Sequence, residues 1–171
     1  MMSIHSLIWL FLAAFMLHDF EEIIRIEPWF RKNAEELSGK IPAGFRSTFL
    51  TMSRMTSSQF AMAVCVEFIG FIPVTFLAAE KGIYLPFLGI NAILLLHVFV
   101  HIAQAVCVRK LVPGVVTAVA ITLPYSVYLF SVLLKESVIG LSDIWLSLPI
   151  GLLLIPLVWI GHLAGESLVS R

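Results

Sequence analysis

Apolar stretches of about twenty residues are the feature that most limits how this chain can fold. A stretch of roughly 20 apolar residues crosses the hydrocarbon core of a bilayer as a helix, because a helix satisfies its own backbone hydrogen bonds where water is absent. Hydrophobic residues make up 60% of the chain and charged residues 13%, whereas a soluble domain has about 25% charged residues. We therefore predict an all-α, polytopic membrane bundle that forms one domain over residues 1–171, with five transmembrane spans at about 4–24, 57–79, 84–108, 113–134 and 143–168.

The longest connection, residues 27–56, separates the first span from the second. It is polar, and Pro28 and two glycines interrupt it, so we expect short helices there rather than another span. Phe45, Phe49 and Met52 recur at helical spacing beside basic residues, which favours an amphipathic helix at the membrane interface. A solvated loop with scattered apolar residues is the alternative.

Basic residues predict the orientation of the bundle. Positively charged side chains are enriched in cytoplasmic loops, and most of those in this chain lie between residues 25 and 54 or at Arg109 and Lys110. The connections expected on the other side of the membrane hold only Lys81 and Lys135. With five spans, this distribution places the N-terminus outside and the C-terminus inside.

Ionisable residues occur inside the predicted spans, where a charged side chain costs on the order of 2.5–3.5 kcal/mol. Residues of this kind face the interior of a bundle and are candidates for function. In the first span Asp19 is turned away from the others and is expected to point elsewhere, towards the interface. Four ionisable residues of that span share one helical stripe, because their spacing is i, i+3, i+4 and i+7: His18, Glu21, Glu22 and Arg25.

The third span carries a second polar stripe, His97, His101 and Gln104, and two histidines spaced i, i+4 can converge on one ion. Glu67 and His162 add one polar group each from the second and fifth spans. At a rise of about 1.5 Å per residue, these groups lie roughly 10–15 Å from the cytoplasmic ends of their helices. The coincidence predicts one shared site in the cytoplasmic half of the membrane. A single buried His or Glu can instead simply hydrogen-bond a neighbouring helix.

Other residues add less to the prediction. Pro124 can kink the fourth span and free a carbonyl group, so the adjacent Tyr125 is a candidate for lining a cavity. Cys65 and Cys107 lack disulfide or zinc spacing, and we expect them to be packing residues. The net charge is zero, which gives no support for nucleic-acid binding. The expected partners are membrane lipids and a lipophilic or small-molecule substrate.

The string HDFEE, from His18 to Glu22, resembles the defining motif of the HXXEE family of small prokaryotic integral membrane proteins. The run LVPGVVTAV, from Leu111 to Val119, is similar to another stretch of that family, and the resemblance covers nearly the whole chain. It implies a location in the prokaryotic cytoplasmic membrane and an active site that includes His18, Glu21 and Glu22. The string EEIIR, which begins at Glu21, is also similar to the glutamate and arginine motif of CAAX-type glutamic intramembrane proteases, in which the arginine lies one residue later.

The first functional hypothesis is a membrane-embedded enzyme that carries out hydrolysis, with or without a metal. Glu21 or Glu22 would activate water as a general base. A catalytic zinc ion needs three protein ligands and an open position, and imidazole with carboxylate suits zinc or iron. His97, His101 and either His18 or Glu22 can supply these ligands.

Two other functions fit the same residues. A proton-coupled or ion-coupled transporter or channel can use the Glu/His layer as a relay, with Arg25 as a counter-ion, and a homo-oligomer would supply further spans. A membrane subunit that binds without catalysis is the third possibility. The sequence contains no P-loop, dinucleotide fingerprint or serine-hydrolase motif, so it offers no support for those activities.

Overall fold

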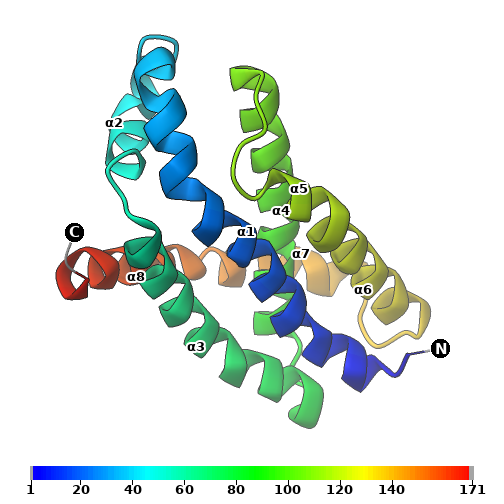
Figure 1. Ribbon diagram of the computed structural model, residues 1–171. Coiled ribbons are helices and arrows are strands. Elements are labelled where there is room, and N and C mark those ends of the chain that lie inside the picture. Colours follow the sequence, from blue (N-terminus) through cyan, green and yellow to red (C-terminus); the bar gives the residue numbers. More distant parts are fainter. Residues whose placement is uncertain (1, 170–171) are drawn as a thin grey trace.

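The computed structural model describes residues 2–169, apart from the side chain of Leu154, and the regular elements it contains there are helices (Figure 1). The predicted all-α class is therefore confirmed. In chain order the elements are α1 (Ile4–Ser38), α2 (Ala43–Met52), α3 (Ser57–Lys81), α4 (Leu85–Val108), α5 (Val115–Thr117), the π-helix η1 (Ala118–Thr122), α6 (Leu123–Lys135), α7 (Leu141–Gly151) and α8 (Leu154–Leu168).

Four helical segments are long and apolar enough to cross a membrane. They are α3, α4, the segment Val115–Lys135 that contains α5, η1 and α6, and the segment Leu141–Leu168 that contains α7 and α8. These segments coincide with the last four predicted spans and agree with a polytopic bundle. The first predicted span, 4–24, lies within α1, and its crossing of the membrane stays a prediction.

The start of the polar connection differs from the prediction. We expected Pro28 to punctuate the chain, but α1 continues through this proline to Ser38. A proline removes one helical hydrogen bond, and contacts with the rest of the protein can hold a helix together across such a defect. Asn33 and Leu37 are buried and supply such contacts. The helix expected around Phe45 is present as α2.

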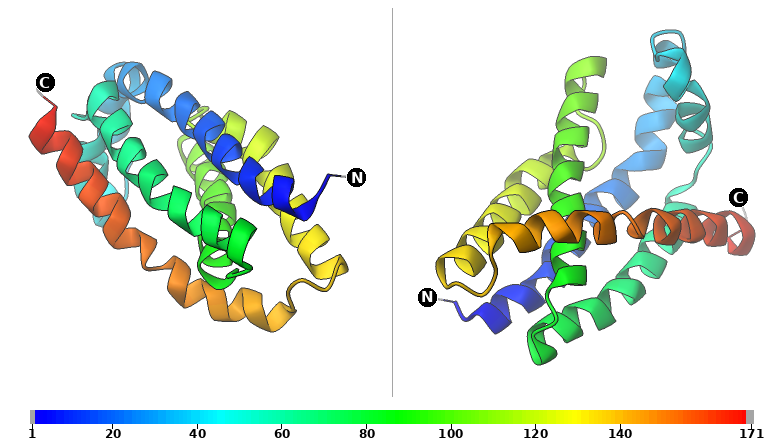
Figure 2. Two further views of the ribbon diagram at one scale, coloured as in Figure 1. Left: turned by 90° about the horizontal axis from the view of Figure 1, so that it is seen from below. Right: turned by 180° about the vertical axis from the view of Figure 1, so that it is seen from behind.

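Helices α3 and α4 lie in the middle of the bundle, with α7 and α8 on one side and α1 and α6 on the other (Figure 2). Helices α1 and α3 lie side by side, while α7 and α8 form one nearly continuous rod that crosses α4 and then α3 (Figure 2). At the first crossing the backbones approach closely, since a Cβ atom added to Gly89 would lie 2.6 Å from the carbonyl oxygen of Ser147. Small residues allow such close approach between membrane helices, where dispersion contacts replace the hydrophobic effect as the main attraction.

An aromatic cluster joins α1, α3 and α4. The ring of Phe11 lies 5.5 Å from that of Phe71 and 5.5 Å from that of Phe87, measured between centroids, and Phe15 lies 4.8 Å from Phe71. These four side chains are buried. Because residues 11, 15, 18 and 22 share one face of a helix, the cluster also turns His18 towards α4.

Many large apolar side chains are exposed on the outer faces of these helices, among them Ile69 and Phe99. This distribution is compatible with contact with membrane lipids. Cys65 and Cys107 are also exposed. The two cysteines were expected to be packing residues, but they lie on uncovered helix faces, because residue type alone does not identify which face of an apolar helix is covered.

Candidate functional site

Four polar side chains from α1 and α4 meet inside the bundle: His18, Glu22, His97 and His101. Each offers one ligand atom, and these four atoms lie within 4.8 Å of one another. His18 and His101 are almost completely buried, at 2% and 4% exposure. Spacings of i, i+4 on both helices put each pair on one face, and the aromatic cluster orients the face of α1. We call these four residues the His/Glu cluster.

The shortest contacts of the cluster converge on one atom. Nε2 of His101 lies 2.9 Å from Oε1 of Glu22 and 2.8 Å from Nε2 of His97. An imidazole nitrogen carries either one proton or one lone pair, so a single His101 proton cannot be donated fully to both neighbours. A cation that accepts the lone pairs of His101 and His97 would remove this conflict, and its charge would offset that of the Glu22 carboxylate. The group can therefore hold a metal ion.

The two glutamates of the motif have separate environments. Oε1 of Glu21 accepts a hydrogen bond from Nη1 of Arg25 at 2.6 Å, and Oε2 accepts from both the backbone N–H and the hydroxyl of Thr117 at 2.7 Å. Glu22 contacts His101 instead. The two glutamates share one helical stripe, yet the structure gives them different partners: Arg25 and Thr117 for Glu21, and His101 for Glu22.

Thr117 links Glu21 to His18. It lies in the first helical turn after Gly114, where backbone N–H groups have no partner within the helix and favour an anion. Because its hydroxyl proton is donated to Glu21, its oxygen can accept a proton from Nδ1 of His18, 3.2 Å away. This hydrogen bond fixes the neutral tautomer of His18 and leaves the lone pair of Nε2 available to the cluster.

Gly114 closes the cluster from the α4–α5 connection. Its φ angle is +82°, a conformation that side chains disfavour. A Cβ atom at this position would lie 2.7 Å from Cε1 of His101 and 2.8 Å from Cγ of Glu22. Gly114 and Thr117 were not predicted from the sequence, although both lie within the run LVPGVVTAV, where the proline–glycine pair is the signal for a tight turn.

Two predicted members of the site lie elsewhere. Gln104 is exposed, because it follows His101 towards the end of α4, where α1 and α4 diverge (Figure 1). Tyr125 is buried, but its hydroxyl donates to the carbonyl of Leu7 at 3.2 Å. Leu7 precedes His18 by about 16 Å of helix. Tyr125 therefore braces the other half of α1 and is not near the cluster.

Three other ionisable residues of the predicted spans are not members of the cluster. Glu67 on α3 is partly buried, and His162 on α8 is partly buried with its ring 6.0 Å from that of Phe60. Asp19 was expected to point towards the interface, but only 6% of its surface is exposed. Its Oδ2 has no hydrogen-bond partner among residues 2–169. Asp19 lies about 100° round α1 from His18. It is buried because α1 also packs against α3.

A family model describing proteins of unknown function with the HXXEE motif matches residues 9–129, well over half of the chain. The chain belongs to the HXXEE family. The match includes His18, Glu21 and Glu22 of the motif, the two α4 histidines and the whole α4–α5 connection. It ends within α6, so the sequence prediction that the resemblance covers nearly the whole chain was too broad. No curated protein and no solved structure matches the chain.

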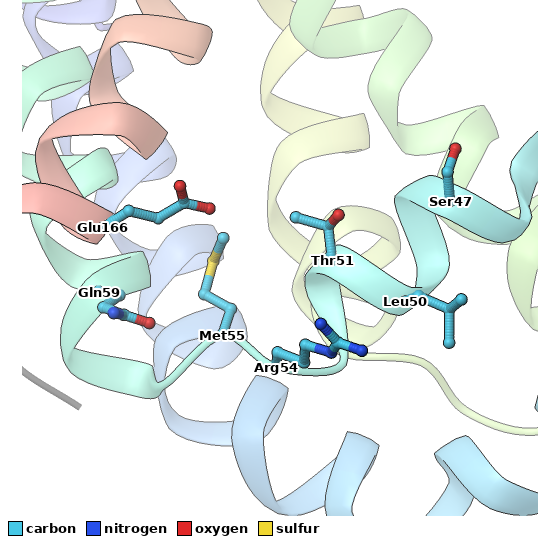
Figure 3. Close-up of a pocket in the computed structure, with 7 residues that line it drawn as sticks. All are labelled: Ser47, Leu50, Thr51, Arg54, Met55, Gln59 and Glu166. Atoms are coloured by element: carbon cyan, nitrogen blue, oxygen red, sulfur yellow. The ribbon is translucent and has the colours of Figure 1, made fainter.

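A hollow of about 410 Å³ lies apart from the His/Glu cluster, between α2, α3 and α8 (Figure 3). Arg54 and Gln59 line it together with Glu166, whose carboxylate points into the space from α8. The residues that line it do not include any member of the cluster. We therefore treat the cluster as the candidate site of this HXXEE protein.

The close contact between Gly114 and the cluster gives a test of this geometry. Gly114→Ala should destabilise the protein more than Gly82→Ala, by about 1–3 kcal/mol. Both glycines have positive φ angles, +82° and +67°, so both substitutions carry similar backbone strain, but at Gly82 the nearest side-chain atom is 4.0 Å away. Thermal unfolding of the two variants in detergent measures the difference. An equal loss of stability would mean that the connection does not pack on the cluster.

Proposed function

We propose that this HXXEE protein is a membrane-embedded, metal-dependent hydrolase that acts on a lipophilic substrate. The observation that carries the proposal is the convergence of three imidazoles and one carboxylate, with ligand atoms within 4.8 Å of one another, among apolar helices. Buried ionisable groups inside membrane helices are costly and mark functional sites. Hydrogen bonding between neighbouring helices does not require four such groups at one point.

His18, His97 and His101 would hold the ion, and three imidazole ligands leave a fourth position open for catalysis. Zinc and iron are the metals that suit imidazole and carboxylate ligands. Such an ion supplies Lewis acidity to a substrate oxygen and makes a water molecule more acidic. Thr117 would support binding through its hydrogen bond to His18, since the outer partners of metal-bound histidines orient the rings.

Glu22 is the residue that we assign to proton transfer, because its carboxylate is in direct contact with the histidines. It would accept a proton from the attacking water and return it to the leaving group. Glu21 is a positioning residue in this proposal, since its two oxygens are occupied by Arg25 and Thr117. The apolar helices around the site would admit a lipophilic substrate from the membrane and limit the access of bulk water.

We also propose that the site lies in the cytoplasmic half of the membrane, with the N-terminus outside and the C-terminus inside. The basic residues between 25 and 54 support this orientation. The cluster precedes them on α1 by roughly one helical turn or more, which is consistent with a position just inside the hydrocarbon core.

A proton or ion relay is the second candidate function. It is favoured by the buried Asp19, whose Oδ2 lacks a hydrogen-bond partner within the described part of the chain, and by Glu67 on the adjacent helix. These carboxyl groups continue the polar layer from α1 towards α3. A relay would make Glu67 essential for proton flux in liposomes, whereas the hydrolase does not require it.

The proposed function first predicts the metal content of the purified protein. Purified protein should contain close to one equivalent of zinc or iron by elemental analysis, and His97→Ala should contain less than about a tenth of that amount, because the ion loses one of few ligands. His5→Ala is the matched control. His5 lies near the start of α1, away from the cluster, and pairs with Glu80 of α3. A wild-type protein that holds no metal and takes up neither zinc nor ferrous iron would rule out the metal-dependent reaction.

The second prediction separates the two glutamates. Glu22→Gln removes the charge of the side chain at similar volume. It should lower the rate of hydrolysis by about 100-fold or more. Glu21→Gln should lower the unfolding temperature more than Glu22→Gln does, because Arg25 loses its ion-pair partner. Mass spectrometry of a total lipid extract incubated with each proteoliposome preparation measures product formation even when the substrate is unidentified. Products that form equally with wild type and Glu22→Gln would contradict the role of Glu22.

A further inference from the structure

A second hollow, of about 370 Å³, lies beyond the His/Glu cluster, between α1 and the connection that follows α4. The residues of α1 that line it continue the stripe that begins at His18 and Glu22, at the same helical spacing. The opposite wall is the start of the connection between α4 and α5. The lining residues on which the argument depends are Arg25, Trp29, Lys32, Asn33, Lys110 and Leu111. We call this space the basic hollow.

Three hydrogen bonds hold the two walls together. The indole N–H of Trp29 donates to the carbonyl of Leu111 at 2.7 Å, and Nζ of Lys110 donates to Oδ1 of Asn33 at 2.8 Å and to Oε2 of Glu36 at 2.5 Å. Hydrogen bonds from Lys110 and Lys40 lower the pKa of Glu36 to about 2, so this carboxylate is ionised at neutral pH. The hollow is therefore bounded by defined contacts rather than by loose side chains.

The charge that lines the basic hollow is entirely positive over the described residues. Arg25, Lys32 and Lys110 line it, and no carboxylate from residues 2–169 does. Arg25 donates one hydrogen bond, to Glu21, and Lys110 donates two, to Asn33 and Glu36. Both side chains therefore retain N–H groups that can bind a ligand. Lys32 has no ion-pair partner in the same part of the chain and keeps all of its donors.

The position of the hollow suits an amphiphile. Tryptophan is enriched at the level of lipid headgroups, and basic pockets on the cytoplasmic side of membrane proteins attract anionic headgroups. Arg25 lies about 6 Å beyond Glu21 along α1, and Lys32 lies about 15 Å beyond Glu22. A headgroup held there would have its acyl chains or ester linkages directed along the α1 and α4 faces towards the His/Glu cluster.

We propose that the basic hollow binds the phosphate-type headgroup of an anionic amphiphile. The Arg25 guanidinium can bind two phosphate oxygens, and Lys32 adds a mobile positive charge. The hollow then selects anionic over zwitterionic lipids. The additional statement that this amphiphile is the substrate class rests on the proposed function, whereas binding in the hollow does not.

The test is native mass spectrometry of the full chain, purified in detergent and supplied with equal amounts of phosphatidylglycerol and phosphatidylcholine. Wild type should retain phosphatidylglycerol in preference, and Lys32→Gln should bind it about fivefold more weakly, the effect expected of one basic residue. Arg31→Gln is the matched control, because Arg31 is the exposed neighbour that does not line the hollow. It should change retention less than twofold. Thermal unfolding confirms that both variants are folded.

Equal retention of the two lipids by wild type, or equal losses in the two variants, would overturn the proposal. Inorganic phosphate identifies the source of the ligand: displacement of the lipid at millimolar phosphate supports a site for free phosphate, and retention supports a lipid headgroup. The measurement is repeated on chelator-treated protein and on Glu22→Gln. Binding that persists there supports the headgroup site even if the metal analysis contradicts the hydrolase, so the two failures are distinguishable.

Discussion

The contact between Glu22 and the histidines of α4 is the interaction on which the rest of the structure depends. A carboxylate and three imidazoles cannot be left unpaired among apolar helices without a large cost in desolvation free energy. They are tolerated because α1 and α4 each present their polar residues at i, i+4 and so pair face to face. The aromatic cluster around Phe11, one to two turns away on α1, keeps this face turned towards α4.

The second constraint is the connection between α4 and α5, which is shaped to fit the cluster. Gly114 gives the backbone access to His101 and Glu22 where no side chain would fit. The free backbone N–H of Thr117, at the start of the following helix, then binds Glu21. The two adjacent glutamates thereby have different environments: Glu21 is paired with Arg25 and accepts hydrogen bonds from Thr117, whereas Glu22 is directed at the histidines. This division is the physical basis for assigning proton transfer to Glu22.

Spacing along the sequence predicted the parts of this site that depend on helical geometry alone. The two stripes on α1 and α4 and the all-helical fold follow from periods of three and four residues and from apolar length. Thr117 and Gly114 were not predicted, because their role depends on how a turn packs against helices far away in the sequence. Gln104 shares the stripe of His101, yet it is exposed, since periodicity does not show where two helices diverge. Asp19 was misplaced for a related reason, because the face of α1 that α3 covers is set by tertiary packing.

X-ray absorption at the metal edge of the purified protein tests the central claim most directly, since it identifies the ligands of the ion that the His/Glu cluster is proposed to hold. We expect the nearest ligand atoms of the ion to be nitrogen and oxygen at about 2.0–2.1 Å, with further scattering from the outer atoms of imidazole rings. The imidazole signal should weaken in His101→Ala, because the shortest contacts of the cluster converge on Nε2 of His101. Nearest ligand atoms that include sulfur at about 2.3 Å, or a spectrum without imidazole scattering, would contradict this expectation.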